Sequence, residues 1–203
     1  MKELPILMNG EMVRATLTDR KTQTRRIMKP QPTHDGFWWS HKGYSCGGEK
    51  QFRDGLPMFV GCPYGAVGDS LWVREAWRIG SPYEKTKLSE FNYPQDELED
   101  YIHYRASDIN KSELIGQYRP SIHMPRWASR ITLEITGVRA ERLNEISPDD
   151  AVAEGIESFA AEHRLTGYWT TAFARLWNSI NGSEIWAANP FVWVIEFKRI
   201  ETA

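Results

Sequence analysis

The chain has 203 residues, which is enough for one domain with a substantial buried core and short for two. Its formal net charge of -2 argues against strong sequence-independent binding to nucleic acid, which depends on neutralising many phosphates. Charged residues make up 26% and hydrophobic residues 41%, and no apolar run approaches the roughly twenty residues of a membrane span. We therefore expect a single globular domain over residues 1–203 and no membrane partner.

The only two cysteines are Cys46 and Cys62, so a disulfide framework is not expected. The apolar stretch near the N-terminus is too short for the core of a signal peptide, and we predict a cytoplasmic protein. His34 and His41 would complete a zinc ligand set with the two cysteines, but the four spacings match no compact zinc-binding motif. We therefore predict no metal and no cofactor.

The first third of the chain predicts a short buried strand at residues 4–8 and a helix at residues 11–18. Residues 29–63 mix glycine, proline and aromatics without a period, which indicates a long irregular loop. A glycine-aspartate turn then leads into a strand at residues 71–77. Alternation along that strand places Glu75 on the same face as its apolar neighbours.

Residues 79–119 are polar, rich in tyrosine and poorly periodic, so we predict an insertion or lid within the domain. Residues 130–138 show the cleanest strand alternation in the chain. Ser147 is a good N-cap for a helix, and a second helix carries an aromatic stripe over residues 169–180 that we expect in the core. A last strand is predicted at residues 191–197.

Strands separated by helices and loops, without a regular βα repeat, indicate an α+β protein. The pattern favours a small β-barrel capped by helices, with one long loop and one insertion.

Basic residues gather in two short segments, residues 20–29 and 119–130, despite the negative net charge. Each segment is either a solvated face or a surface that holds phosphate. The side chains that we expect to contact a nucleic-acid backbone are Arg25, Arg26, Arg126 and Arg130.

Residues 19–26 read D-R-K-T-Q-T-R-R, and residues 68–75 read G-D-S-L-W-V-R-E. In this order the two runs resemble the two signatures of the ASCH family, G-R-K-T-x-T-R-R and G-D-x-L-W-V-R-E. Asp19 stands where the family often has glycine. Residues 124–131 and 189–197 resemble a longer branch of the family that is associated with phages and prophages.

The resemblance implies a PUA-like barrel with a cleft suited to nucleobases or RNA. Some small ASCH proteins are amidohydrolases that remove the acyl group from N4-acylated cytidine, such as N4-acetylcytidine. Lys21, Thr24 and Glu75 occupy the positions that match their catalytic residues, and we predict that the three converge on one cleft. Thr24 would be the nucleophile, Lys21 a base whose pKa is lowered by desolvation, and Glu75 a buried proton donor.

The same residues permit other functions. Thr24 can simply cap a turn, and Glu75 can be a structural partner of a nearby arginine. A non-catalytic reader of RNA or of a modified nucleoside would use the same groups to hydrogen-bond a base. A ribonuclease is the third alternative, although no pair of histidines is well placed for it. The sequence leaves the choice between hydrolase and reader open.

Overall fold

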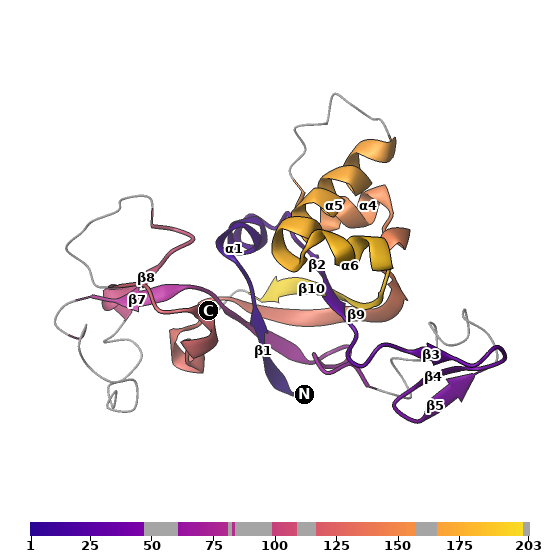
Figure 1. The fold of residues 1–203 in the computed structure, drawn as a ribbon. Coiled ribbons are helices and arrows are strands. Elements are labelled where there is room, and N and C mark those ends of the chain that lie inside the picture. The colour runs from indigo at the N-terminus through magenta and orange to yellow at the C-terminus, as the bar shows by residue number, and fades with distance from the viewer. Residues whose placement is uncertain (47–60, 81–82, 84–98, 109–116, 157–165, 201–203) are drawn as a thin grey trace.

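The computed structural model describes residues 1–46, 61–80, 83, 99–108, 117–156 and 166–200 (Figure 1). The α+β class predicted from the sequence is confirmed. The helices are α1 (Gly10–Leu17), α4 (Pro148–Ala153), α5 (Thr166–Asn181) and α6 (Ser183–Ala188), with 3-10 turns at η2 (Glu99–Tyr101), η3 (Ser121–His123), η4 (Arg126–Ala128) and η5 (Leu143–Glu145). The strands are β1 (Glu3–Leu7), β2 (Gln23–Ile27), β3 (Thr33–His34), β4 (Trp39–His41), β5 (Tyr44–Cys46), β6 (Ser70–Arg74), β7 (Trp77–Ile79), β8 (Ile102–Tyr104), β9 (Thr132–Arg142) and β10 (Phe191–Ile200). Within these described ranges, no helix is both long and apolar enough to cross a membrane.

The centre of the fold is a five-stranded sheet with the order β1-β6-β9-β10-β2. β1 pairs with β6 in parallel, and the other neighbours are antiparallel. β9 and β10, the two longest strands, form the middle of the sheet, and their ladder shifts register once at Glu196 and Phe197. β2 and β6, which carry the two sequence signatures, are therefore separated by two strands.

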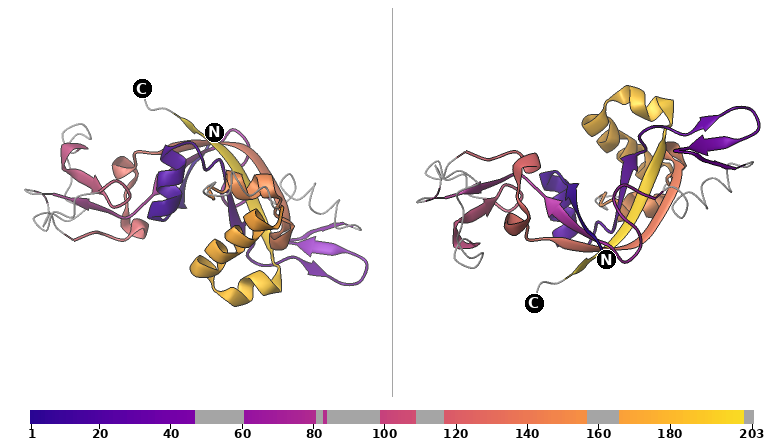
Figure 2. Two further views of the ribbon diagram at one scale, coloured as in Figure 1. Left: turned by 90° about the horizontal axis from the view of Figure 1, so that it is seen from above. Right: turned by 90° about the horizontal axis from the view of Figure 1, so that it is seen from below.

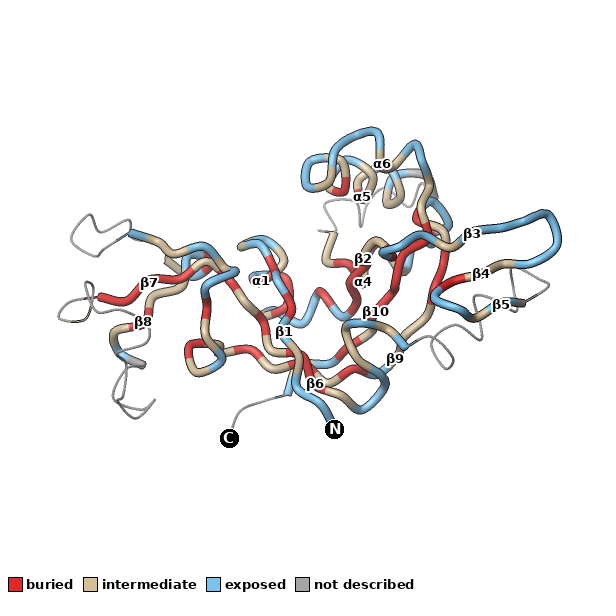
Figure 3. The backbone as a smooth tube through the Cα atoms, turned by 60° about the horizontal axis from the view of Figure 1, so that its bottom comes forward, coloured by how far each residue is buried: buried red, intermediate tan, exposed pale blue. Residues whose placement is uncertain are grey.

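β10 is buried on both faces from Phe191 to Ile195, whereas the sequence predicts alternation with one inward face. Trp193, Ile195 and Phe197 belong to one apolar core, as predicted for the inward face. Val192 and Val194 belong to a second core, in which α4, α5 and α6 pack over this end of the sheet. Buried backbone runs through the middle of the molecule in Figure 3. A strand covered on both faces reads as a continuous apolar run.

The sheet does not close into the barrel that the sequence suggested. β1 and β2 lie at its two edges, and no ladder joins them in the part of the chain that the structure describes. A side chain crosses this gap: Arg26 on β2 donates from Nη2 to the backbone oxygen of Leu7 at 2.7 Å. Because β2 reaches the end of β1 through a guanidinium and not through its backbone, the edges stay open.

The helices begin where their caps predict. The Ser147 side chain accepts a hydrogen bond from the backbone of Asp150 at 3.1 Å, so α4 begins at the predicted residue. Asn9 caps α1, because its side chain accepts a hydrogen bond from the Met12 backbone at 2.8 Å. Both caps satisfy N–H groups that have no partner inside the helix.

The aromatic stripe of α5 divides between two roles. Phe173 and Trp177 are buried in the second core, as expected. Leu176 and Ile180 instead line a hollow between α5 and the rest of the protein, and Ile180 is 46% exposed. The expectation that the whole stripe is core is therefore wrong for the C-terminal end of the helix.

Two smaller sheets project from opposite ends of the central sheet (Figure 2). β3, β4 and β5 form one of them, within the stretch predicted as a loop, of which residues 47–60 lie outside the description. β7 and β8 form the other, at the predicted insertion, where residues 81–82, 84–98 and 109–116 are likewise not described. The insertion at residues 79–119 remains a prediction.

The central position of β10 gives a first test. Ile195 is fully buried, and Ile195→Ala should lower the free energy of unfolding by about 3 kcal/mol, because it removes buried methylenes and leaves a cavity. Urea denaturation measures this loss. Lys198→Ala on the same strand removes an exposed side chain that pairs with Glu134 at 3.0 Å, and it should cost below about 1 kcal/mol. Equal losses for the two variants would contradict the central position of β10.

Candidate functional site

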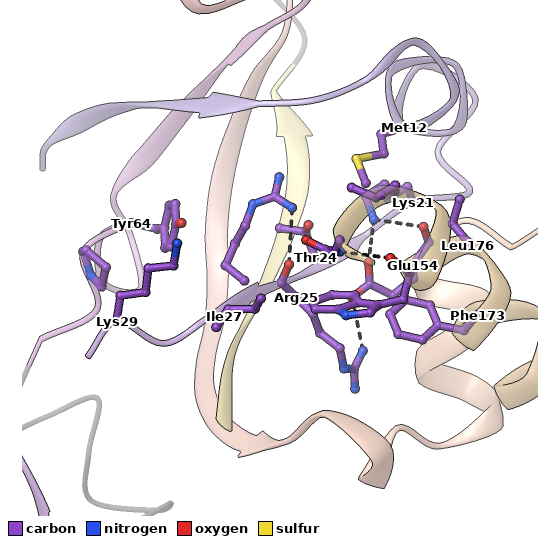
Figure 4. Close-up of a pocket in the computed structure, with 15 residues that line it drawn as sticks. Met12, Lys21, Thr24, Arg25, Ile27, Lys29, Tyr64, Glu154, Phe173 and Leu176 are labelled. Carbon is purple, nitrogen blue, oxygen red and sulfur yellow. Dashed lines mark hydrogen bonds and ion pairs between the residues drawn. The ribbon is translucent and has the colours of Figure 1, made fainter. Parts of the chain in front are cut away.

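A cavity of about 300 Å³ lies between α1, β2 and α5 (Figure 4). Its polar side is formed by side chains from the first sequence signature and from the residue after α4, namely Lys21, Thr24, Arg25, Arg26 and Glu154. Its apolar side is formed mainly by β2 and α5, through Ile27, Phe173, Leu176, Trp177 and Ile180. An apolar hollow with a few convergent polar groups is the usual form of a small-molecule site.

Lys21 is buried and forms an ion pair with Glu154. Its Nζ donates to Oε2 of Glu154 at 2.7 Å and to the backbone oxygen of the same residue at 2.9 Å. Burial lowers the pKa of Lys21, and the charge of Glu154 opposes that shift without cancelling it. The pair is therefore a place where a proton can move between two buried groups.

A glycine allows the two segments to approach so closely. Gly155 follows Glu154 and has a φ of +90°, a conformation that side chains rarely adopt. A Cβ on this residue would lie 2.9 Å from the Cβ of Ala15 and 3.1 Å from the Cβ of Lys21. Any larger residue would push the end of α4 away from Lys21.

Arg25 is held among carboxylates below the cavity. Its Nη1 lies 3.2 Å from Oε1 of Glu154, and its Nη2 lies 3.1 Å from Oδ2 of Asp150 and bonds to Glu141. Arg139 joins the same network, at 3.0 Å from Glu141 and 2.8 Å from Asp150. Arg25 thus forms its ion pairs inside the protein, and the predicted contact with a phosphate would require breaking these ion pairs.

Thr24 lines the cavity, and the hydrogen bonding of its side chain is incomplete. It is 1% exposed, and its Oγ1 has no hydrogen-bond partner within the described residues. The indole nitrogen of Trp177, another lining residue, is also buried without a partner there. Buried polar groups are nearly always hydrogen-bonded, so unmet ones that line a cavity point to a ligand.

Glu75 does not line this cavity, so the predicted convergence of Lys21, Thr24 and Glu75 does not occur. Glu75 follows β6, is 2% exposed, and accepts from Arg130 Nε at 2.9 Å and Nη2 at 3.2 Å. Burial raises the pKa of Glu75, and Arg130 acts against that rise. The separation arises because β9 and β10 stand between β6 and β2.

The other predicted phosphate contacts are also divided by the fold. Arg126 bonds to Glu3 at 2.6 Å, and Arg130 pairs with Glu75, so both are satisfied by carboxylates away from the cavity. Arg26 lines the cavity and donates hydrogen bonds to the backbone oxygens of Arg25 at 3.3 Å and Leu7 at 2.7 Å. Of the four arginines, Arg26 alone lines the cavity without a carboxylate partner in the described chain.

Sequence reasoning missed Glu154, the partner of Lys21. The available signal was weak: a glutamate followed by glycine at the end of a capped helix. Nothing local connects that position to residue 21, because the two lie 133 residues apart.

The candidate zinc ligands do not come together where the structure shows them. His34 packs against Trp39 with ring centroids 4.7 Å apart, and His41 packs against Trp193 at 6.4 Å. Among the described residues no three histidine, cysteine, aspartate or glutamate side chains are grouped to hold a metal, and the side chain of Cys46 is not described. Burial raises the pKa of Cys62 to about 11, so its thiol stays protonated at neutral pH.

Comparison with family models, with curated proteins and with solved structures finds no match to this chain. The resemblance of its two signatures to the ASCH family therefore stays a prediction.

The buried pair gives a test of the site as built. Glu154→Gln leaves the Lys21 ammonium without its anionic partner, and it should lower the free energy of unfolding at neutral pH by about 3 kcal/mol. Losing Glu154 also lowers the pKa of Lys21 further below its usual 10.5 in the folded state, so the unfolded chain binds more protons. The stability penalty should consequently shrink as the pH rises toward that value.

Chemical denaturation at several pH values measures this penalty. Glu134→Gln is the matched control, because Glu134 makes the same kind of pair with Lys198 at an exposed site, and it should cost at most about 1 kcal/mol. A Glu154→Gln penalty that is small or independent of pH would show that Lys21 does not depend on Glu154.

Proposed function

We propose that this chain binds an acylated nucleobase or nucleoside in the cavity and hydrolyses the amide on its exocyclic nitrogen, with N4-acetylcytidine as the representative substrate. The observation that carries the proposal is the buried Thr24 hydroxyl, which lines the cavity and has no partner among the described residues. Residues 19–26 and 68–75, which resemble the ASCH signatures, support the same activity. We also propose that the open sheet is a variant of the PUA-like architecture.

The cavity suits a flat heterocycle. Its volume of about 300 Å³ lies at the lower end for small-molecule sites. Phe173 and Trp177 offer aromatic surface on one wall, and bases in single-stranded or free form are usually recognised by stacking and by bonds to their polar edges. Thr24, Lys21 and Glu154 provide the polar edge.

The proposed chemistry uses the residues that meet at the cavity. The Thr24 oxygen attacks the acyl carbon, the bond from that carbon to the exocyclic nitrogen breaks, and the nitrogen leaves with a proton as the free amine. Water then cleaves the threonine ester and releases the acid. Lys21 accepts the hydroxyl proton and returns it to the leaving nitrogen, and this requires its neutral form. Burial favours that form, whereas the charge of Glu154 opposes it.

In this proposal Glu154 provides the carboxylate for which the sequence suggested Glu75. Glu75 is then the structural partner of Arg130, to which it is bonded twice.

A non-catalytic reader of RNA or of a modified nucleoside is the second candidate. Two observations favour it: the Nζ of Lys21 donates two hydrogen bonds to Glu154, and Glu75 is absent from the cavity lining. A reader needs only the unmet hydrogen-bonding capacity of Thr24 and the aromatic wall. The ribonuclease alternative has less support, because no histidine of the described chain lines the cavity.

Incubation with N4-acetylcytidine and related acylated nucleosides, followed by chromatography for released cytidine, tests the proposal. The parent protein should release cytidine, and Thr24→Val should reduce kcat/KM by about a thousandfold or more, because it removes the nucleophile. Thr24→Val should not reduce thermal stability, since the hydroxyl that it removes is buried without a described partner.

The Glu75→Gln variant tests whether Glu75 or Glu154 is the carboxylate used in the reaction. If it is Glu154, the activity of Glu75→Gln per folded molecule should match that of the parent. Loss of activity in folded Glu75→Gln would return the catalytic role to Glu75. A parent that binds the nucleosides through Thr24 but releases no cytidine would support the reader and exclude the hydrolase.

A further inference from the structure

The cavity opens on one side into a second hollow of about 570 Å³. The two spaces share Met12, Arg26, Tyr64 and Ile180 in their linings, so they are parts of one cleft. The second hollow extends along β1 toward Arg74 at the end of β6. A ligand whose flat part fills the cavity can therefore extend into this hollow.

The lining of the second hollow is positively charged. Among the described residues, it contains Arg26 and Arg74 and no acidic residue. Lys29 lines the neighbouring cavity on the same side as Tyr64, away from Lys21 and Glu154 (Figure 4). Two cations thus line the second hollow, and a third lies on the adjacent part of the cavity wall.

Both arginines keep hydrogen-bonding capacity. Arg26 donates to two backbone oxygens, and Arg74 donates from Nη2 to the backbone oxygen of Ile122, while the buried Nε of Arg74 has no partner. Among the described residues neither arginine pairs with a carboxylate, in contrast to Arg25 and Arg130. A guanidinium has five N–H donors and a full charge, and it recognises phosphate in a bidentate way.

A third hollow on the other side of the cavity gives the comparison. It has a volume of about 450 Å³ and is lined by Arg14 and Arg20 together with Glu11 and Glu154. Its two cations are matched by two carboxylates, so it has no excess positive charge. Positive charge is therefore in excess at the end of the cleft near Arg74, and this is the end where we expect an anion to bind.

We propose that the hollow lined by Arg26 and Arg74 is a phosphate subsite, so that the ligand of the cavity is a phosphorylated nucleoside and not the free nucleoside. The phosphate is that of a mononucleotide or of a nucleotide within an RNA strand, since both present the same group. This inference rests on the proposed binding of a base in the cavity. It replaces the broader backbone contact expected of Arg25, Arg126 and Arg130.

Calorimetry with N4-acetylcytidine, its 5′- and 3′-monophosphates and a short acetylated RNA oligomer tests the subsite. At least one phosphorylated ligand should bind about tenfold or more tightly than the nucleoside, because charge-assisted hydrogen bonds contribute that much. The advantage should fall as salt rises from about 50 to about 200 mM, because added ions screen the attraction. A preference for a monophosphate or for the oligomer identifies the source of the phosphate.

Arg26→Gln and Arg74→Gln should each remove most of this advantage. Arg74 does not line the base cavity, so Arg74→Gln should also leave nucleoside affinity unchanged. Glutamine keeps an N–H donor for the backbone oxygens and removes the charge, and circular dichroism checks the fold. Arg20→Gln, in the charge-balanced hollow, is the matched control and should preserve the advantage.

The outcomes separate this inference from the proposed hydrolysis. Equal affinity for nucleoside and nucleotides, or an advantage that survives in both glutamine variants, overturns the phosphate subsite even if N4-acetylcytidine is hydrolysed. Binding of no ligand overturns it as well. Arginine-dependent binding of a nucleotide without release of the acyl group supports the subsite and contradicts the hydrolase.

Discussion

The buried ion pair between Lys21 and Glu154 is the constraint on which the rest of the site depends. A buried charge without a partner costs several kcal/mol, so neither residue can leave the other while the protein remains folded. Lys21 precedes β2 and Glu154 follows α4, so the pair holds the helix end against the start of the strand. Arg25 extends the connection to β9 through Glu141. The cavity occupies the space that this arrangement leaves between β2 and α5.

The same arrangement explains why Thr24 is available. Lys21, Arg25 and Glu154 bond to one another or to neighbouring carboxylates, so their hydrogen-bonding capacity is largely satisfied inside the protein. Thr24 stands next to Arg25 in sequence and is as buried as these residues, but its hydroxyl takes no part in the network. A hydroxyl without a partner beside a rigid network is well suited to bind or attack a ligand, because the neighbouring groups do not form hydrogen bonds with it.

The basic residues show how the fold assigns different roles to similar side chains. Arg25, Arg126 and Arg130 neutralise carboxylates from other elements, and their contribution is to structure. Arg26 and Arg74 bond to backbone oxygens, which orients a guanidinium without neutralising it. The net charge of -2 conceals this difference, because it counts paired and unpaired cations alike.

Local features were predictable from the sequence alone. The α+β class, the strand beginning at Phe191 and the helix capped by Ser147 follow from periodicity and capping, which depend on residues a few positions apart. The sequence also brought Lys21 and Thr24 into one site, because they belong to one short motif. Tertiary structure alone decided that Glu154 lines the site and Glu75 does not, and that the sheet stays open. Lys21 and Glu154 lie 133 residues apart in the sequence, and Glu75 and Arg130 lie 55 residues apart. The tertiary fold therefore determines these partners, and no local sequence pattern predicts them.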